Sequence, residues 1–255
     1  MQAIAFVSPA RLLLAVALVA VGCGGPPAPV VEASGPAAPP APVRVAVLVD
    51  KTASTSWTRV PVVSAEDFEQ FLALLTRRGG ELAVGLIRDR SNRGLLRLRI
   101  LPPPAAPQPP NPHQNPFLLA EARAAYETRS REHRDHVALW RREVERRLAV
   151  FRAQLGELLE TKADATRSDI WGALRRVELF LNEPHNSASG TPHNWILLVS
   201  DGEDNVRRPR VVLRSGARLL VINSSATIGV LQDLEPLGFE SFPAAAAFLL
   251  QEESK

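Results

Sequence analysis

Three short apolar runs constrain the fold of this chain more than any other feature. They are VRVAVLV, NWILLVS and RLLVINS, at residues 43–49, 194–200 and 218–224. Each run is largely apolar, and the first contains four valines, which are β-branched; this pattern predicts strands that are buried on both faces. Strands of this kind pair in parallel, and the connections between them are usually helices. We therefore predict an α/β domain with a doubly wound, mostly parallel central sheet flanked by helices.

Further elements are predicted after the first run. Residues 64–78 carry apolar side chains on one helical face, and Gly79-Gly80 are typical of a helix C-terminus. Residues 81–89 and 95–101 have strand patterns separated by a short polar turn, which predicts a hairpin. The Pro-rich residues 102–116 are expected to form a surface loop.

Residues 117–162 predict a long helix inserted into the α/β fold, because they contain no proline and are rich in Ala, Arg, Glu and Leu. Apolar residues recur in the second half at spacings of three and four, so this half should bury one face: Val137, Trp140, Val144, Leu148, Phe151, Leu155 and Leu158. The first half has little apolar surface. We expect it to project into solvent or to pack on a partner.

The N-terminus predicts export and lipid anchoring. Arg11 precedes an apolar run that is too short to span a bilayer comfortably, as in a secretory signal peptide. Ala20-Val21-Gly22-Cys23 then resembles the lipobox of bacterial lipoproteins, in which the signal peptide is cut before a lipidated cysteine. This resemblance implies a signal peptide at residues 1–22 and lipidation of Cys23, the only cysteine of the chain.

The same region predicts how the chain is organised and where it resides. Residues 23–42 are Pro/Ala-rich and should form an extended tether, and residues 43–255 should form the folded domain. No second apolar run approaches the length of a transmembrane helix. We expect a protein of the bacterial cell envelope that is held to a membrane by its lipid. The outer membrane is favoured because Gly24 stands where inner-membrane lipoproteins often carry aspartate.

The charge pattern argues against a nucleic-acid partner. The chain has 30 basic and 27 acidic residues, and its arginines are interleaved with glutamates. A nucleic-acid interface needs a clustered basic face, and single-strand binding also needs aromatic side chains for stacking. Aromatic residues make up only 5% of this chain. We expect no nucleic-acid partner.

Polar oxygen ligands follow the ends of the predicted strands. Asp50 and Asp201 end two buried runs, Thr52 and Ser54 follow the first, and Ser168 stands where the next helix begins. Ligands of open α/β sheets bind at the carboxyl ends of the strands. Two carboxylates and three hydroxyls suit Mg²⁺, Mn²⁺ or Ca²⁺ and not zinc. The helix that begins near Ser168 is also expected to offer free N–H groups to an anion.

These residues resemble the metal-ion-dependent adhesion site of the von Willebrand factor A-type domain. The family pattern is Asp-x-Ser-x-Ser, then a Thr on a middle loop, then Asp-Gly after a strand. Here the three pieces are DKTAS at 50–54, SDIWGAL at 168–174, and Asp201-Gly202. The resemblance implies a binding module and not an enzyme. It also implies a metal held by Asp50, Thr52, Ser54, Ser168 and Asp201, and a protein partner whose carboxylate completes the metal shell.

Some features depart from the pattern. Thr52 replaces a serine and Ser168 replaces a threonine, and both substitutions keep the hydroxyl. Thr166 competes for the middle position, but only Ser168 puts the following Ile and Ala-Leu in the family register. Lys51 beside the site is expected to point to solvent. An alternative is a degenerate metal site on the same fold, with the long helix as the interaction surface.

A rival hypothesis uses the same residues for catalysis. DKTAST at 50–55 resembles the nucleophile motif of the haloacid dehalogenase superfamily, which would make Asp50 a phospho-aspartate in a Mg²⁺-dependent phosphatase, with Asp201 and Asp204 on the metal. Against this, Thr52 stands where the phosphatases need an acid. The ATPase branch needs membrane helices, and Lys162 is the only mid-chain lysine.

Overall fold

The computed structural model describes residues 41–56, 60–91, 94–113, 115–184, 190–206, 208–223 and 229–255. The predicted signal peptide, Cys23 and nearly all of the predicted tether lie outside these ranges. Within them, no helix combines the length and the apolar character that crossing a bilayer requires.

In the described part of the chain, six strands form one sheet in the order β3-β2-β1-β4-β5-β6, and only β3 is antiparallel to its neighbour. The three apolar runs supply β1, β4 and β5, and the predicted hairpin supplies β2 and β3. The chain winds in one direction from β1 and in the other from β4, which confirms the doubly wound, Rossmann-like α/β fold. The bounds are Val43–Asp50 (β1), Gly80–Ile87 (β2), Leu96–Ile100 (β3), His193–Val199 (β4), Arg218–Ile222 (β5) and Leu237–Phe239 (β6).

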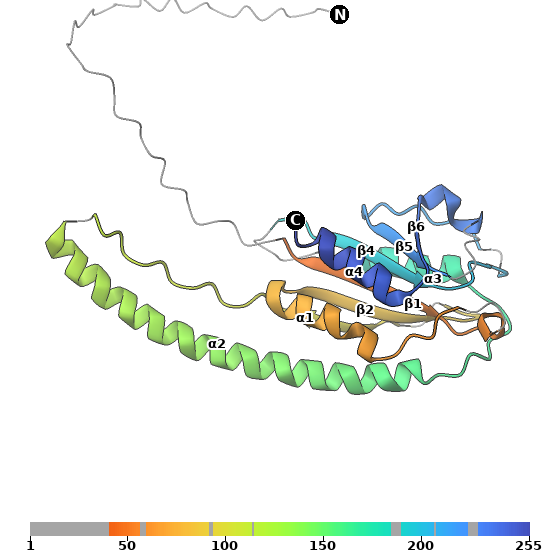
Figure 1. Ribbon diagram of the computed structural model, residues 1–255, viewed down its shortest axis with the longest axis horizontal. Helices are drawn as coiled ribbons and strands as arrows, with labels where there is room; N and C mark the ends of the chain where they lie inside the picture. Colours follow the sequence, from red (N-terminus) through yellow and green to blue (C-terminus); the bar gives the residue numbers. More distant parts are fainter. Residues whose placement is uncertain are drawn as a thin grey trace, which may run out of the picture. The chain divides into compact units, whose positions relative to one another are not determined.

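The alternation of side chains along β1 divides the core into two layers. Val45 and Val47 point to one face of the sheet, whereas Ala46 and Leu48 point to the other. The first face packs on α1 (Glu69–Arg78), α2 (Pro116–Leu159) and α4 (Phe242–Glu252), and the second on α3 (Ile170–Leu181). Figure 1 shows these helices around the sheet. Burial on both faces explains why the central strands are apolar almost throughout.

Aromatic packing joins α1 to α4. The rings of Phe68, Phe71 and Phe242 have centroids 5.4 to 6.4 Å apart. The predicted apolar face of 64–78 is confirmed, since Phe68, Phe71, Leu72 and Leu75 are all buried. Gly79 and Gly80 then connect α1 directly to β2 with φ angles of 74° and 138°. Both angles lie in the region that only glycine adopts readily.

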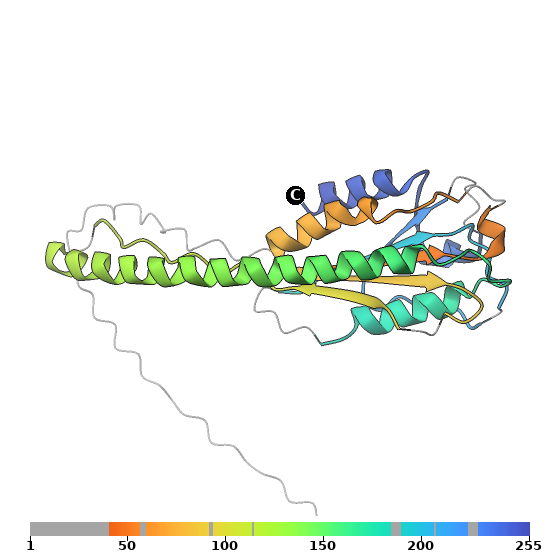
Figure 2. The same ribbon diagram turned by 90° about the horizontal axis from the view of Figure 1, so that it is seen from below.

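The long helix α2 has 44 residues and begins at Pro116, where Asn115 accepts a hydrogen bond from the N–H of Phe117. It is roughly 66 Å long at 1.5 Å per residue, more than twice the length of the longest strands here. Its buried residues are all in the second half: Val144, Phe151, Leu155 and Leu159. Leu158 is only partly buried, so the predicted face is off by one residue at this end. The first half extends past the sheet (Figure 2), as expected.

Candidate functional site

Asp50, the last residue of β1, lies at the centre of a cluster of hydroxyl groups. Its Oδ1 accepts hydrogen bonds from the backbone N–H of Thr52, at 3.0 Å, and from the Thr52 hydroxyl, at 2.7 Å. Its Oδ2 accepts from the hydroxyls of Ser168, at 3.0 Å, and Ser200, at 2.7 Å. Asp50 is only 4% exposed. One buried carboxylate therefore joins three separate segments of the chain.

The sheet topology brings these segments together. β1 and β4 are neighbours, and the chain leaves them in opposite directions, so a crevice forms beyond their carboxyl ends. The loop after β1 and the loop before α3 pair through a bridge between Thr52 and Ala165. The loop after β4 is fixed by Asn205, whose side-chain oxygen accepts from Ser168 N–H at 2.8 Å and whose N–H donates to Ser168 O at 3.1 Å.

The hydroxyl groups are oriented by the carboxylate. A hydroxyl has one hydrogen to donate and two lone pairs. When Asp50 is ionised it can only accept, so Thr52 and Ser168 direct their hydrogens at it and their oxygens act as acceptors on the other side. The Ser54 hydroxyl lies 3.1 Å from that of Thr52 and extends the group. The loop after β1 thus presents two hydroxyl oxygens beside a third from Ser168.

Asp201 completes the set of sequence-predicted residues. It follows β4, is 5% exposed, and accepts a hydrogen bond from the N–H of Glu203 at 3.1 Å. The negative charge of Asp201 is one of the causes that raise the pKa of the Asp50 carboxyl. The structure therefore links Asp50, Thr52, Ser54 and Ser168 by hydrogen bonds and places Asp201 within electrostatic reach.

The electrostatics of the cluster favour a cation. Burial is the largest cause that raises the pKa of Asp50 above 3.8, and the hydroxyl hydrogen bonds only partly oppose it. Among the described residues, the hydrogen-bond partners of this carboxylate are three hydroxyls and an N–H, and none is a charged side chain. Two acids beside oriented lone pairs fit a hard divalent ion.

The prediction that Lys51 points to solvent is wrong. Its Nζ donates a hydrogen bond of 2.7 Å to the carbonyl of Leu159, and the residue is half-buried. Burial lowers the pKa of this amine. The last carbonyls of a helix lack partners within the helix and attract positive charge, so the C-terminus of α2 draws Lys51 toward itself. The lysine connects the site loop to the long helix.

The expectation of free N–H groups at the start of α3 is wrong. Asp169 Oδ1 accepts from Gly172 N–H at 3.0 Å. Asp204 Oδ1 accepts from the N–H groups of Ile170, at 2.8 Å, and Trp171, at 3.4 Å. Carboxylates of the chain itself therefore fill the place that was predicted for an external anion. Oδ1 of Asp204 is used in this way.

Asp204→Ala is expected to lower the free energy of unfolding by about 1 kcal/mol, the usual cost of losing a helix cap. The affinity for divalent metal should not change, because Oδ1 of Asp204 accepts from two N–H groups of α3. Urea denaturation and metal titration measure the two quantities. Asp204→Asn is the matched control and should keep most of the stability. A large loss of metal affinity in Asp204→Ala would place Asp204 among the metal ligands.

Ser200 is the residue of the cluster that sequence reasoning missed. It is fully buried, and its hydroxyl also accepts from Gly202 N–H at 3.1 Å. In the sequence, Ser200 is the last residue of an apolar run, and only its position directly before Asp201 indicates a polar role. For the middle loop, the structure separates the two candidates, since Thr166 is exposed whereas Ser168 is buried and bonded to Asp50.

The cluster differs in composition from metal sites built on His, Cys, Asp and Glu side chains. Among the described residues, no three His, Cys, Asp or Glu side chains gather as a metal site. The Asp50 cluster has only two carboxylates, and its other oxygens belong to hydroxyls and are therefore weaker ligands. Oxygen-rich sites with few charges bind divalent ions less tightly. A metal titration of this protein should therefore extend to millimolar concentrations.

Comparison with known proteins adds two solved structures. A scan against models of protein families gave no match, and a search of curated proteins gave none. A von Willebrand factor type A protein from Catenulispora acidiphila is 14% identical with a TM-score of 0.43, over 84% of this chain and 42% of that one. Proximal thread matrix protein 1 from the mussel byssus is 11% identical with a TM-score of 0.38, over 84% and 48%. This chain thus spans less than half the length of either structure.

Proposed function

We propose that the chain is an exported, lipid-anchored binding module of the von Willebrand factor A type, which docks a protein partner through a divalent metal. The observation that carries this proposal is the set of hydroxyls held by one buried carboxylate at the switch point of the sheet. No other cluster among the described residues combines oxygen ligands with a place where α/β sheets bind ligands.

Five residues would hold the metal, which is Mg²⁺, or alternatively Mn²⁺ or Ca²⁺. The hydroxyls of Thr52, Ser54 and Ser168 would bind directly, and the carboxylates of Asp50 and Asp201 would bind directly or through water. A bound divalent ion supplies a positive centre that attracts a carboxylate. The partner would therefore present an acidic side chain to this site, and the chain would act without enzymatic turnover.

The proposal includes a location. The sequence from Arg11 to Cys23 supports cleavage of a signal peptide and lipidation of the cysteine. The Pro/Ala-rich residues that follow would hold the domain away from the lipid surface. We propose the bacterial cell envelope as the location, with the outer membrane favoured where the cell has one.

Metal titration tests the central part of the proposal. Calorimetry on the chain from residue 24 onward, without the cysteine, is expected to detect Mg²⁺ or Mn²⁺ binding at millimolar concentrations or below. A pull-down with the same protein is expected to recover a partner that EDTA releases. Asp201→Ala should lose both, because it removes one of the two carboxylates. The absence of any binding at millimolar metal would contradict the proposed site.

The first half of α2 supports a second candidate, in which the metal site is degenerate and the helix binds the partner. None of the residues 116–143 is buried, and Phe117 is 89% exposed at the tip. Under this hypothesis, deleting residues 121–136 abolishes capture and Asp201→Ala leaves it intact. The metal hypothesis gives the opposite result in the same pull-down. One experiment therefore decides between the two.

The same protein tests the phosphatase hypothesis. That hypothesis needs Asp204 near the metal, whereas its Oδ1 accepts from the N–H groups of α3. We expect no hydrolysis of a phosphatase reporter in the presence of Mg²⁺. Turnover that disappears in Asp50→Asn would contradict the binding-module proposal.

A further inference from the structure

The free edge of the sheet faces a groove on the side of α2. Among the described residues, β3 is the last strand of the sheet and its one pairing partner is β2. A groove of about 280 Å³ lies between this strand and α2. Its apolar lining is Leu98, Val150 and Phe151, and two arginines from each element also border it.

The backbone of β3 has hydrogen-bonding groups that the sheet does not use. In an antiparallel pair, every second residue directs its N–H and C=O toward the neighbouring strand. The carbonyl of Arg99 accepts instead from Arg147 of α2, at 3.1 Å. The backbone N–H and C=O groups of Arg99 therefore face away from β2. Those of Arg97, two residues earlier, face the same way. Among the described residues, no loop backbone or side chain accepts from the N–H of either arginine.

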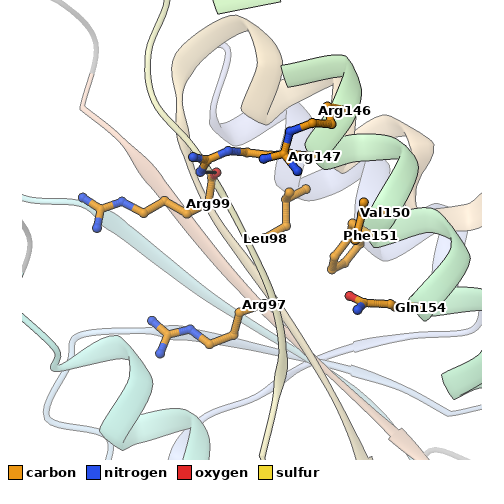
Figure 3. Close-up of a pocket in the computed structure, with 8 residues that line it drawn as sticks. All are labelled: Arg97, Leu98, Arg99, Arg146, Arg147, Val150, Phe151 and Gln154. Carbon is orange, nitrogen blue, oxygen red and sulfur yellow. Dashed lines mark hydrogen bonds between the residues drawn. The ribbon is translucent and has the colours of Figure 1, made fainter. Parts of the chain in front are cut away.

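The side chains around this edge fall into two groups (Figure 3). Arg97 and Arg99 leave the strand on the side away from α2, whereas Leu98 points toward Phe151. An extended chain laid along β3 would also direct its side chains alternately to the two sides. One set would meet the arginines of the strand. The other set would enter the apolar groove beside Val150 and Phe151.

The edge carries an excess of positive charge. Arg97 pairs with Glu81 and Glu183, and on α2 Glu143 pairs with both Arg146 and Arg147. Arg99 reaches Glu81 only through its Nε, at 3.6 Å, and its two terminal nitrogens have no partner among the described residues. The four arginines that line the groove thus face three glutamates, and one of these also pairs with Arg44.

We propose that the edge of β3 binds an extended acidic segment of a protein partner by strand addition. The segment would pair with the outward N–H and C=O groups of Arg97 and Arg99. Its acidic side chains would meet the guanidinium groups, and its apolar side chains would enter the groove. A second copy of the chain would bring arginines against arginines, so an acidic partner fits this edge and self-association does not.

Strand addition also changes the role of Arg147. A backbone N–H from the bound segment would take over the carbonyl of Arg99. The guanidinium of Arg147 would then be free to pair with a carboxylate of the segment. The edge is separate from the hydroxyl cluster around Asp50, and the contact does not need a divalent metal.

A synthetic heptapeptide of alternating glutamate and valine is the probe, and fluorescence anisotropy in EDTA is the readout. We expect saturable binding to the chain from residue 24 onward. Three changes should weaken it about tenfold or more: Arg99→Ala, Val150→Asp, and N-methylation of alternate amides of the peptide. Val212→Asp is the matched control at an exposed valine and should bind as the wild type does. Circular dichroism establishes that each variant is folded.

The outcomes separate this proposal from others. Equal binding of the N-methylated peptide would overturn strand addition, because the backbone hydrogen bonds would then not matter. Equal binding of a peptide with lysine in place of glutamate would overturn the acidic partner. Binding of anionic vesicles with no binding of the peptide would assign the edge to a lipid surface. Because the assay contains EDTA and no metal, failure of the metal site leaves its result unchanged.

Discussion

Asp50→Asn is expected to weaken the binding of Mg²⁺ or Mn²⁺ about a hundredfold or more, while the fold is retained. The substitution keeps the shape of the side chain but removes one of the two negative charges in the cluster, and charge count is a main determinant of affinity at oxygen sites. It also replaces one of two oxygens, each of which accepts two hydrogen bonds, by an amide nitrogen that can only donate. Calorimetric titration measures the change.

The same variant is expected to be more stable than the wild type in EDTA at neutral pH. Burial raises the pKa of Asp50 in the folded state above its ordinary value of 3.8. The folded state therefore holds this proton more tightly than the unfolded state does. The resulting stability is fully present below about pH 4 and is lost as the pH rises through the folded-state pKa. Asparagine has no such loss, so the stability of the variant relative to the wild type should rise as the pH increases from about 4 to neutral.

Asp135→Asn provides the control for both measurements. This residue is exposed on the projecting half of α2, so neither metal affinity nor stability should change. A metal affinity equal to that of the wild type in Asp50→Asn would exclude the hydroxyl cluster as the binding site. A lower stability of that variant in EDTA would mean that the hydrogen bonds of the carboxylate stabilise the fold by more than the burial of its charge destabilises it.

Gly80→Ala is expected to lower the free energy of unfolding by about 3 to 5 kcal/mol. Gly80 has a φ of 138°, and a Cβ there would lie 2.1 Å from the backbone carbonyl of Val43 and 2.9 Å from the side chain of Leu75. The clash is with the backbone of the central strand, so no side-chain rotation relieves it. The melting temperature of a domain of this size should fall by about 10 °C. Thermal and urea denaturation measure the effect.

Gly94→Ala is the matched control, because among the described residues no atom outside its chain neighbours lies within 4 Å of the Cβ that it would add. Its stability should change by less than about 1 kcal/mol. An unchanged melting temperature in Gly80→Ala would contradict the alignment of β1 with β2, in which Val43 lies opposite Gly80. The pair of variants therefore tests the register that places Asp50 at the end of its strand.

The elements that the sequence predicted well are those in which burial follows a simple period. VRVAVLV and NWILLVS are apolar at nearly every position because both faces of their strands are covered, and they became β1 and β4. In the second half of α2, apolar residues recur at spacings of three and four, and this half packs on the sheet. The types of the candidate ligands also followed from the sequence, since carboxylates and hydroxyls directly follow the strands.

The sequence by itself determined a doubly wound sheet, a long half-exposed helix and a group of carboxylate and hydroxyl side chains at the strand ends. Only the tertiary structure decided which partner each polar side chain takes. Ser200 joins Asp50, Lys51 turns to Leu159, and Asp204 caps α3. The physical reason is that periodic burial is a local property of a segment, whereas a hydrogen bond between loops depends on how distant segments meet at the edge of the sheet.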